Sequence, residues 1–361
     1  MELYIYDNTL NFKGIIDIYE SLIWIRKYSK CGEFELHLPL TDTHLMLLEK
    51  ENIIYKRDTS EAAYIEYINL IQNDDGTESI IVKGKFLTGY LNRRIIWDTE
   101  NFNTTSELAI RQLINNNCIN PTNVDRKINL LQLGALKGYT QDINLQVSYK
   151  NLLSEVESIA STSELGIRTI LDIHNKNIIL DVYKGVDRTA GQSINPKAIF
   201  SKEFENILEQ EYIDTISNYK NIALIAGSGE GAERTLTTVG TGNGLNRFEL
   251  FADARDLQQE ELSTNEYILL LQQRGNEKLS ENGAIQAFNS KINVNSNLTY
   301  KVDFDLGDIV TCISKRWGIT IDARITEIEE VYEMDGLSIN ITFGNDIPTL
   351  IEKLRKVTLW Q

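Results

Sequence analysis

Three small residues after an apolar run come closer to a nucleotide-binding motif than any other part of this sequence. Gly227, Gly229 and Ala232 follow Asn221-Ile-Ala-Leu-Ile-Ala226 with the spacing G-x-G-x-x-A. In dinucleotide-binding folds such glycines open a helix whose N-terminus holds the pyrophosphate, inside a parallel βαβ unit. Here the β-branched run Arg234-Thr-Leu-Thr-Thr-Val-Gly240 follows instead. We therefore predict a glycine-rich β-turn, and keep a nucleotide-using enzyme as the less favoured alternative.

A group of acidic residues near the C-terminus has the oxygen ligands of a calcium loop without its spacing. The group consists of Asp303, Asp305 and Asp308. A calcium loop needs a glycine after its third ligand position and a distant bidentate glutamate, whereas Gly307 comes one position too early. The apolar residues between the acids favour a strand with a glycine bulge. The alternative is that these acids meet Arg or Lys of a neighbouring subunit, so we expect no metal site.

The residues needed for nucleophilic or metal-assisted catalysis are scattered along the chain. Its histidines are His37, His44 and His174, and none has a serine or cysteine nucleophile placed near it. Neither a Gly-x-Ser-x-Gly elbow nor a His-Glu-x-x-His helix occurs. The three cysteines are far apart and odd in number, which favours reduced, buried thiols. We predict a protein that is not an enzyme and has no catalytic residues, no cofactor and no metal.

Charge and hydropathy exclude two further classes of function. The 361 residues carry 36 Lys and Arg against 52 Asp and Glu, a net charge of −16, and an acidic surface repels phosphates and anionic lipids. Arg93 and Arg94 form a single basic pair beside Ile95-Ile-Trp97, where salt bridging at an interface is favoured over a nucleic-acid patch. No apolar run approaches the ~18 residues of a membrane span. We expect neither specific nucleic-acid binding nor membrane insertion.

The first 98 residues have the alternation and turn residues of an antiparallel sheet. Strands at 21–28 and 33–38 are predicted to join through Ser29-Lys-Cys-Gly32, and strands at 63–71 and 78–83 through Asn73-Asp-Asp-Gly76. A short helix is expected between these hairpins, with Thr41 as its cap and Leu45 and Leu48 pointing inward. This part is predicted to be a first β domain.

From residue 99 to residue 190 the apolar period changes from two to 3.6 residues. Thr104 and Glu107 have the spacing of a capping box that opens one helix. A second helix is expected from near Ser148, because its apolar residues form one stripe. The stripe consists of Leu152, Leu153, Val156, Ile159 and Ala160. A hairpin over 167–183 completes a small α+β domain, which we predict to be inserted between two β domains.

The remaining residues, 191–361, return to strands. Ser263 and Glu266 form a capping box before a single helix at about 264–280. Alternating runs at 319–326 and 337–343 flank Asp335-Gly336, which predicts an antiparallel meander or small barrel as a C-terminal block. Parts of this region are expected to complete the first β domain. Residues 346–356 suit a short terminal helix, for which packing on its own domain is favoured over docking a partner.

Several blocks in a fixed order resemble the siphovirus-type phage tail proteins that are related to baseplate hubs. The blocks are Lys83–Ile96, Asp187–Thr189, Phe200-Ser201, Tyr219–Asn221, Ala226–Arg234, Phe251–Arg255, Asp303–Val310, Arg324–Ile328 and Phe343-Gly344. They span nearly the whole chain. The resemblance marks the following as structural or interface residues: Arg93, Arg94, Asp187, Arg188, Gly227, Gly229, Gly231, Arg234, Asp303, Asp305, Gly307, Asp308, Arg324 and Gly344.

The resemblance implies an α+β, β-rich fold with two tube-like antiparallel β-barrel domains. Three copies would form a trimeric ring of six barrels that adapts a sixfold tail tube to a threefold central spike. The partners would be the tail tube protein, the spike, the tape-measure protein and other baseplate proteins of a phage or phage-tail-like particle, assembled in the bacterial host cytoplasm. Only residues 345–361 follow Phe343-Gly344, so any lytic activity is expected on another chain. A receptor-binding tail protein is the alternative.

Overall fold

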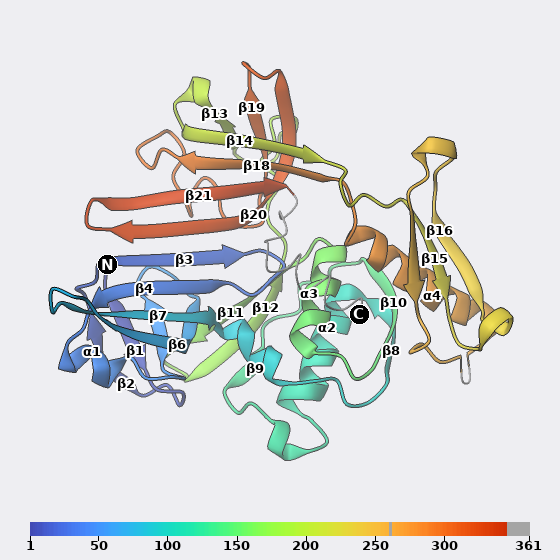
Figure 1. Ribbon diagram of the computed structural model, residues 1–361, viewed down its shortest axis with the longest axis horizontal. Helices are drawn as coiled ribbons and strands as arrows, with labels where there is room; N and C mark the ends of the chain where they lie inside the picture. Colours follow the sequence, from blue (N-terminus) through green and yellow to red (C-terminus); the bar gives the residue numbers. More distant parts are fainter. Residues whose placement is uncertain (260–261, 345–361) are drawn as a thin grey trace. The chain divides into compact units, whose positions relative to one another are not determined.

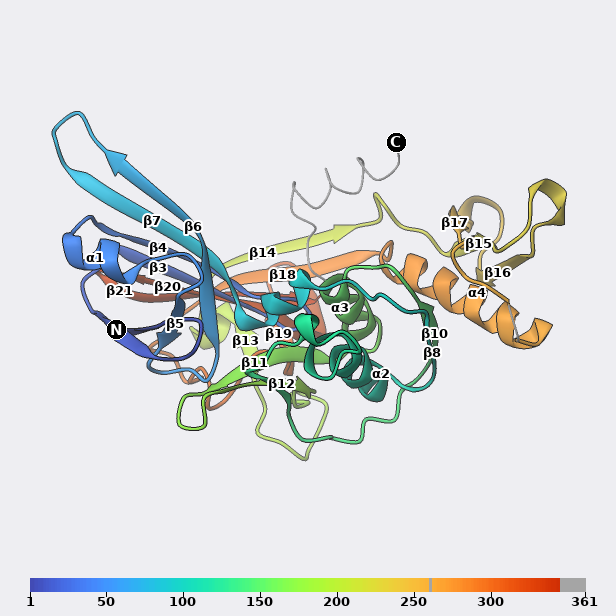
Figure 2. The same ribbon diagram turned by 90° about the horizontal axis from the view of Figure 1, so that it is seen from below.

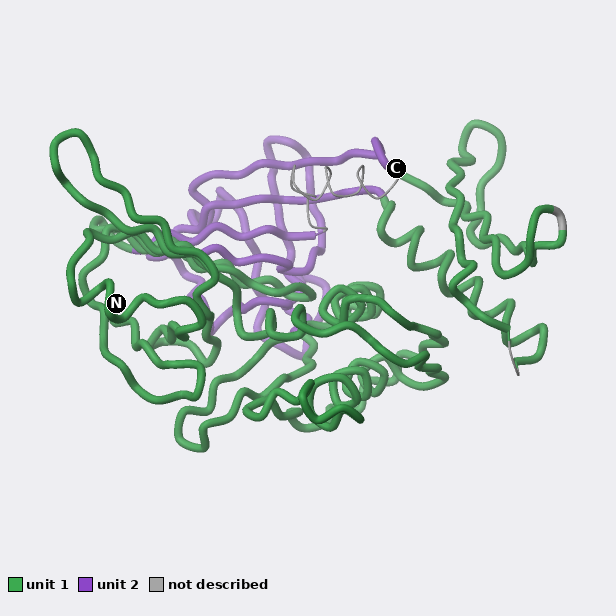
Figure 3. The backbone as a smooth tube through the Cα atoms, turned by 60° about the horizontal axis from the view of Figure 1, so that its bottom comes forward, with its two compact units in different colours: residues 1–184, 219–283, 330–336 green, residues 185–218, 284–329, 337–361 purple. Residues whose placement is uncertain are grey.

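The computed structural model describes residues 1–259 and 262–344 (Figure 1). The chain divides into two compact units. Unit 1 contains residues 1–184, 219–283 and 330–336. Unit 2 contains, among the described residues, 185–218, 284–329 and 337–344 (Figure 3). Each unit is therefore built from segments that are far apart in the sequence. The three-part division at residues 98 and 190 remains a prediction.

Antiparallel strands from the N-terminal part of the chain form the main sheet of unit 1. Its order is β3-β4-β7-β6-β5-β1-β2. The elements are β1 Leu3–Tyr6, β2 Phe12–Ile16, β3 Ser21–Lys27, β4 Glu33–Pro39, α1 Asp42–Leu47, β5 Ile53–Lys56, β6 Ala62–Gln72 and β7 Glu78–Phe86. Every second residue of β3 and β4 is buried, which is the pattern of a sheet with one face on a core. Hairpin β6–β7 projects from this sheet (Figure 2).

The turns of this sheet lie where the sequence predicts them. Residues 29–32 connect β3 to β4, which are antiparallel partners. Asn73-Asp-Asp-Gly76 connects β6 to β7. Gly76 has φ +81°, a conformation that glycine adopts without steric cost. Both hairpins are thus confirmed, because their turn residues determine the local geometry.

The prediction for helix α1 is confirmed at its cap and wrong in part for its inward face. The Thr41 hydroxyl accepts a hydrogen bond from the His44 amide at 3.1 Å. Leu48 is buried as expected, but the Leu45 side chain is 40% exposed. His44 and Leu47 are the buried residues of this six-residue helix, because residues three positions apart share a face.

Residues 100–183 add helices and two small sheets to unit 1. The elements are β8 Glu100–Thr105, α2 Ser106–Ile114, β9 Leu131–Leu133, β10 Asp142–Val147, α3 Leu152–Thr162, β11 Gly166–Asp172 and β12 Asn177–Tyr183. Strands β8 and β10 are antiparallel, and the second sheet has the order β11-β12-β9. The predicted apolar stripe of α3 is buried. Its N-cap is Asn151, three residues later than the predicted start near Ser148.

The predicted capping box at α2 is wrong by one residue and in the role of its glutamate. Thr104 pairs with Ile143 in the sheet, so Thr105 becomes the N-cap and accepts a hydrogen bond from the Leu108 amide. The buried Glu107 carboxylate does not reach back to the cap. It accepts hydrogen bonds at 2.7–3.0 Å from the backbone amides of residues 137–139. The amides of loop 137–139 need acceptors, and the Glu107 carboxylate binds them and not the backbone of the cap.

The third segment of unit 1 is a small sheet covered by one helix. Its elements are β15 Ile222–Ala226, β16 Leu236–Gly240, β17 Glu249–Asp253 and α4 Thr264–Ser280. The order is β16-β15-β17, with β16 antiparallel and β17 parallel to β15. The predicted capping box is confirmed: Ser263 accepts from the Glu266 amide, and the Glu266 carboxylate accepts from the Ser263 amide at 2.9 Å. Helix α4 packs on β15 through Tyr267 and Leu271.

Unit 2 is built on two sets of strands that share β20. Its elements are β13 Ile199–Ser201, β14 Ile207–Thr215, β18 Ile285–Ile292, β19 Ile309–Ser314, β20 Ile319–Glu333 and β21 Gly336–Gly344. The order β14-β18-β21-β20 forms one set, and β13-β19-β20 forms the other. Phe200 joins the two sets, since its ring centroid lies 5.1 Å from that of Phe304 and 5.0 Å from that of Phe343. The predicted Asp335-Gly336 turn is confirmed between β20 and β21.

The end of β20, residues 330–333, belongs to unit 1, where it carries a buried ion pair. The Lys56 ammonium lies 2.5 Å from the Glu330 carboxylate and 2.9 Å from the Tyr332 hydroxyl. The side chains of Lys56 and Glu330 are 0% and 1% exposed. The ammonium also lies over the Tyr332 ring at 4.9 Å. A strand from late in the chain is thus held to β5 by charge inside the core.

The strand pairings of the described residues close no barrel, so barrel closure stays a prediction. Cys31, Cys118 and Cys312 are free thiols, as expected. Burial raises the pKa of Cys31 and of Cys118 to about 12, which keeps both protonated. None of the helices in the described ranges combines the length and the apolar character needed to cross a membrane. The expected terminal helix at 346–356 lies outside the described residues.

Candidate functional site

The glycine-rich segment of unit 1 is a turn between antiparallel strands, as the sequence predicts. Strand β15 ends at Ala226, and β16 begins at Leu236. Gly229 has φ +106° and Gly231 has φ +53°, so both adopt conformations that favour glycine. A single 3₁₀ turn at Gly231–Glu233 follows, in place of the long helix that a pyrophosphate site requires. The local geometry of a dinucleotide site is therefore missing.

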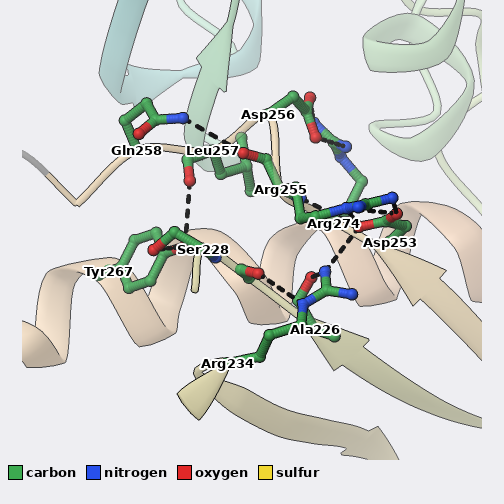
Figure 4. A network of polar contacts seen from close by, with 11 residues as sticks. Ala226, Ser228, Arg234, Asp253, Arg255, Asp256, Leu257, Gln258, Tyr267 and Arg274 are labelled. Atoms are coloured by element: carbon green, nitrogen blue, oxygen red, sulfur yellow. Dashed lines mark hydrogen bonds and ion pairs between the residues drawn. The ribbon is translucent and has the colours of Figure 1, made fainter. Parts of the chain in front are cut away.

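Gly227 is required because a helix approaches the turn closely. A Cβ atom at this position would lie 2.4 Å from the Tyr267 hydroxyl oxygen and 3.0 Å from a Leu271 methyl carbon. Tyr267 is fully buried on α4. Its hydroxyl accepts a hydrogen bond from the Ser228 amide at 2.7 Å and lies 3.0 Å from the Leu257 carbonyl oxygen (Figure 4). The tyrosine thus ties the turn to the helix.

Arg234 ties the same turn to the neighbouring strand β17. Its guanidinium donates to the carbonyl oxygens of Ala226 and Gly227 and forms an ion pair with Asp253 at 2.6 Å (Figure 4). Arg255 binds the other oxygen of Asp253 at 2.6 Å. Hydrogen bonds from Arg255 and then from Arg234 lower the pKa of Asp253 to about 2. The carboxylate therefore stays ionised between two cations and serves as a fixed acceptor.

A second ion pair connects α4 to the residues after β17. The Arg274 guanidinium binds both oxygens of Asp256 at 3.0 and 3.1 Å, a bidentate arrangement that fixes its orientation. Glu277 lies one turn further along α4, 3.7 Å from Arg274. Burial, reinforced by the nearby Glu155, raises the pKa of Glu277. These groups hold the helix in place; a nucleophile with an adjacent base does not occur among them.

In unit 2, the acidic residues form a turn, which corrects the predicted strand with a glycine bulge. Asp308 is buried and receives hydrogen bonds from the Val186 amide at 2.7 Å, the Arg188 guanidinium at 2.8 Å and the Asp305 amide at 3.0 Å. Gly307 has φ +93°, and β19 begins only at residue 309. Asp308 thus meets an arginine of its own chain, because the turn after residue 300 brings segment 185–188 alongside.

The other marked residues of this region also support turns. Asp303 accepts a hydrogen bond from the Thr299 amide at 2.8 Å, and Asp187 accepts from the Thr189 amide at 2.9 Å. Arg324 donates to the Gly307 carbonyl oxygen at 2.8 Å. Within the described ranges, no three His, Cys, Asp or Glu side chains are grouped to hold a metal ion. The three aspartates therefore take part in local turn contacts, one of which joins the Asp305 amide to the Asp308 carboxylate.

The two adjacent arginines near residue 93 contact protein groups. The Arg93 guanidinium stacks on the rings of Tyr64 and Tyr90 at 4.7 and 4.4 Å and forms an ion pair with Glu51 at 2.8 Å. Arg94 donates to the backbone carbonyl oxygens of residues 126 and 93.

Gly344, at the end of β21, occupies a position that only glycine fits. It has φ +91°, and a Cβ atom there would lie 2.3 Å from the Gln286 carbonyl oxygen.

Sequence reasoning missed the buried pair of Lys56 and Glu330. These residues are 274 positions apart, and neither is part of a recognisable local pattern. Lys56 ends the apolar run Ile53-Ile-Tyr55, where the charge of a lysine favours an exposed side chain. One weak signal for a buried charge was present in the sequence. Glu330 and Tyr332 are two positions apart in a strand, so the carboxylate and the aromatic ring lie on the same face.

The fold is that of phage tail proteins. It is shared with the tail protein from Neisseria meningitidis MC58 at a TM-score of 0.60 and 12% identity, over 95% of this chain and 96% of that one. The 43 kDa tail protein of prophage MuSo2 from Shewanella oneidensis has a TM-score of 0.57 and 12% identity, over 95% of this chain and 98% of that one. Prophage tail protein gp18 from Listeria monocytogenes EGD-e has a TM-score of 0.53 and 12% identity, over 99% of both chains.

Sequence similarity then identifies the family. Residues 2–345 match the family of Siphovirus ReqiPepy6 Gp37-like proteins, and the chain belongs to that family. No curated protein is similar enough in sequence to match this chain. Family and fold together make this a phage-tail-type structural protein, which confirms the resemblance seen in the sequence.

Proposed function

We propose that this chain is a hub protein of a phage tail or phage-tail-like particle, and that three copies form its ring. The observation that carries the proposal is the fold shared with prophage tail proteins over 95% or more of the chain, together with its division into two β-rich units. Two units in each of three copies give six similar positions around one axis. Such a ring matches a sixfold tube on one side and a threefold spike on the other.

In this proposal the sheets of the two units become tube-like barrel domains when the ring closes. A sheet with a free edge presents backbone donors and acceptors that another chain can bind. In unit 1, strand β2 is the last of its sheet order. The α+β region at 99–190 would then lie on the outside of the ring. The role is structural and needs no enzymatic activity, cofactor or metal.

The region around β2 also has the apolar surface that a subunit contact needs. Phe12 and Ile15 on this strand are 56% and 45% exposed, and Ile18 and Met46 nearby are 69% and 64% exposed. A hollow of about 580 Å³ lies beside them, with Leu47 in its wall. Exposed apolar patches of this kind mark protein contacts. A neighbouring copy of the chain is the occupant that the ring requires.

The net charge of −16 fits a hub through which DNA passes, because an acidic surface does not retain phosphates. The partners in this role are the tail tube protein, the central spike, the tape-measure protein and other baseplate proteins. Specific nucleic-acid binding and membrane insertion have no part in it. The location is the tail or baseplate of the particle, and assembly takes place in the bacterial host cytoplasm.

Cryo-electron microscopy of the assembled particle tests this proposal. We expect three copies around the axis between tube and spike. A peripheral location would overturn the hub role and favour a receptor-binding tail protein. Binding of the isolated chain to host cells or glycans would then support that alternative.

A variant of the exposed strand tests the contact itself. Ile15→Lys is expected to lower incorporation into particles by about tenfold, because it places a charge in an apolar contact. Val124→Lys is the matched control, since Val124 is 77% exposed and lies far from β2 in the sequence. Both variants are first checked for an unchanged unfolding transition. Equal incorporation of the two variants would contradict a contact at β2.

A further inference from the structure

A surface patch of unit 1 combines apolar side chains with arginines. Ile95 and Trp97 alternate with the buried Ile96, so both point outward, and they are 47% and 48% exposed. The Arg126 guanidinium lies over the Trp97 ring at 4.4 Å. Tryptophan and arginine are the side chains that contribute most where two proteins meet. The patch therefore has the composition of a protein contact.

The two arginines of the patch are held in place without being neutralised. Arg94 and Arg126 donate to backbone carbonyl and side-chain amide oxygens at 2.5–3.0 Å. Among residues 1–259 and 262–344 neither guanidinium forms an ion pair, in contrast to Arg93, which binds Glu51. Burial, with the charge of Arg94 acting in the same direction, lowers the pKa of Arg126. A carboxylate from another chain would offset both effects.

The segment that pairs with Ile96 adds a tyrosine in an unfavourable backbone conformation. The Tyr149 amide donates to the Ile96 carbonyl oxygen, and the Ile96 amide donates to the Lys150 carbonyl oxygen, so two residues oppose one in a β-bulge. Tyr149 has φ +57°, which glycine adopts without steric cost. It is also 75% exposed, so burial of its ring does not offset that cost. Strain of this kind is retained where a side chain has a function.

The edge strand of unit 2 has the complementary side chains. Among the described residues β14 pairs only with β18, so its other edge is open to another chain. Residues 204–216 carry four carboxylates and neither Lys nor Arg. Phe204, Leu208 and Ile216 in the same segment are exposed. This strand is therefore both acidic and apolar, as a partner of the patch has to be.

Beside β14 a buried acceptor lacks a donor. Asn289 on β18 is the partner of Glu211 across the sheet and donates to its carboxylate at 3.1 Å. The side-chain oxygen of Asn289 is buried and has no hydrogen-bond partner in the part of the chain that the structure describes. A hollow of about 420 Å³ opens here, with Glu209 and Glu211 in its lining. Arginine side chains are donors only, so they suit the acceptor and the carboxylates alike.

We propose that this patch, which consists of Arg94, Ile95, Trp97, Arg126 and Tyr149, binds strand β14 of a second copy of the chain. The arginines lie against the carboxylates of β14, and the apolar side chains of the patch cover those of the strand. Both surfaces belong to this chain, so a second copy satisfies the two at once. Different surfaces meet on the two sides, and such contacts close into rings. The inference rests on the proposed function for the number of copies, which is three.

Sedimentation velocity of the full chain, from micromolar to nearly millimolar concentration, tests the contact. Wild type is expected to associate. Tyr149→Gly removes the ring and relieves the backbone, so association should weaken at least about tenfold while the thermal unfolding temperature stays the same or rises. Lys176→Gly is the matched control, because Lys176 also has a positive φ, +53°, in an exposed turn of unit 1. It should leave association unchanged.

A mixture of two charge variants shows whether different copies meet. Arg94→Glu, and separately the double variant Glu209→Arg, Glu211→Arg, should each associate at least about tenfold more weakly than wild type. Mixed together they should associate again, because the reversed patch of one copy meets the reversed strand of another. Val124→Lys adds a cation to the turn that carries Arg126 and should not weaken association with an acidic strand.

The proposal is overturned by wild type that stays monomeric throughout, or by Tyr149→Gly that associates as wild type does. It is also overturned if the two charge variants keep the wild-type unfolding transition but fail to associate when mixed. Cryo-electron microscopy separates this contact from the hub role. Three copies around the particle axis with the patch away from β14 would overturn the contact alone, whereas a peripheral location with the contact present would overturn the hub role alone.

Discussion

Two groups of charges in unit 1 do similar work in opposite surroundings. Lys56 and Glu330 join strands that are distant in the sequence, and their side chains are almost completely shielded from water. Arg234, Asp253 and Arg255 join a turn to a strand, but the Asp253 side chain is 39% exposed and that of Arg255 is 67% exposed. Lys56 binds both Glu330 and the partly exposed Asp58, and Asp253 binds both Arg234 and Arg255, but solvent screens the exposed group more. Burial, more than the number of ion pairs, therefore determines how much each group contributes to the free energy of unfolding.

The buried pair also selects one arrangement of the chain. An unpartnered charge in the core is strongly unfavourable, so Lys56 accepts only neighbours that compensate it. Glu330 and Tyr332 do so from the end of β20. At the exposed turn, water replaces any lost partner, and the shape of the turn depends instead on the close packing of Gly227 against Tyr267. The comparison predicts three effects of decreasing size.

Removing Lys56 should have the largest effect. Lys56→Met leaves the Glu330 carboxylate buried without its cation, and the expected loss is about 3–5 kcal/mol in the free energy of unfolding. Denaturant unfolding followed by tryptophan fluorescence measures it, since Trp24 is fully buried next to the pair. Lys13→Met, which removes the exposed ion pair with Glu49, is the control with an expected change of about 0–1 kcal/mol.

A double variant separates the effect of the buried charges from the effect of the space that the Lys56 side chain fills. Lys56→Met combined with Glu330→Leu removes both charges and should recover most of the loss, because apolar side chains of similar volume replace buried ion pairs well. A double variant as unstable as Lys56→Met alone would show that the space around the pair, and not its charge, carries the effect.

Gly227→Ala should have an intermediate effect. The added methyl group meets the Tyr267 hydroxyl and a Leu271 methyl, and overpacking of this kind costs about 1–3 kcal/mol. Gly191→Ala is the matched control, because a Cβ atom there meets nothing within 4 Å. Thermal unfolding of both variants measures the difference. If the two substitutions have the same effect, the close approach of α4 does not determine the turn.

Neutralising Asp253 should have the smallest effect, and it should depend on pH. The pKa of Asp253 is lowered from 3.8 to about 2 in the folded protein by Arg255 and Arg234. Its contribution is therefore present above the unfolded pKa and is lost as the pH falls through the folded pKa. With solvent screening, Asp253→Asn should cost at most about 1 kcal/mol at neutral pH.

The pH range of this effect follows from the two pKa values. The difference in unfolding free energy between wild type and Asp253→Asn should disappear between about pH 4 and about pH 2. Urea unfolding of both proteins across this range measures it. A loss at neutral pH as large as that of Lys56→Met would break the comparison between the exposed and the buried group.

Local signals were the predictable part of this molecule. The turns at 29–32 and 73–76 and the capping box at Ser263 depend on neighbouring residues, and the structure has all three. The polar pairs depend on residues far apart in the chain: 120 positions separate Arg188 from Asp308. A sequence pattern within a window of a few turns has no information on such pairs.

The errors have the same origin. Glu107 has the spacing of a capping residue, but a loop 30 positions away takes its carboxylate. Asp308 was predicted in a strand because apolar residues surround it, whereas its partners come from segment 185–188. Barrel closure stays a prediction for a related reason, since pairing between distant strand edges leaves no local trace in the sequence.

The return of residues 330–336 to unit 1 also affects how the protein is made. A ribosome adds about 5–20 residues per second, so the 274 residues between Lys56 and Glu330 take roughly 14–55 s to synthesise. During that time the first sheet lacks the buried Glu330 carboxylate that Lys56 binds in the folded protein. Unit 1 thus reaches its final form only after residues 330–336 have been synthesised. An aborted nascent chain that ends before β20 is therefore expected to be a substrate for chaperones and proteases.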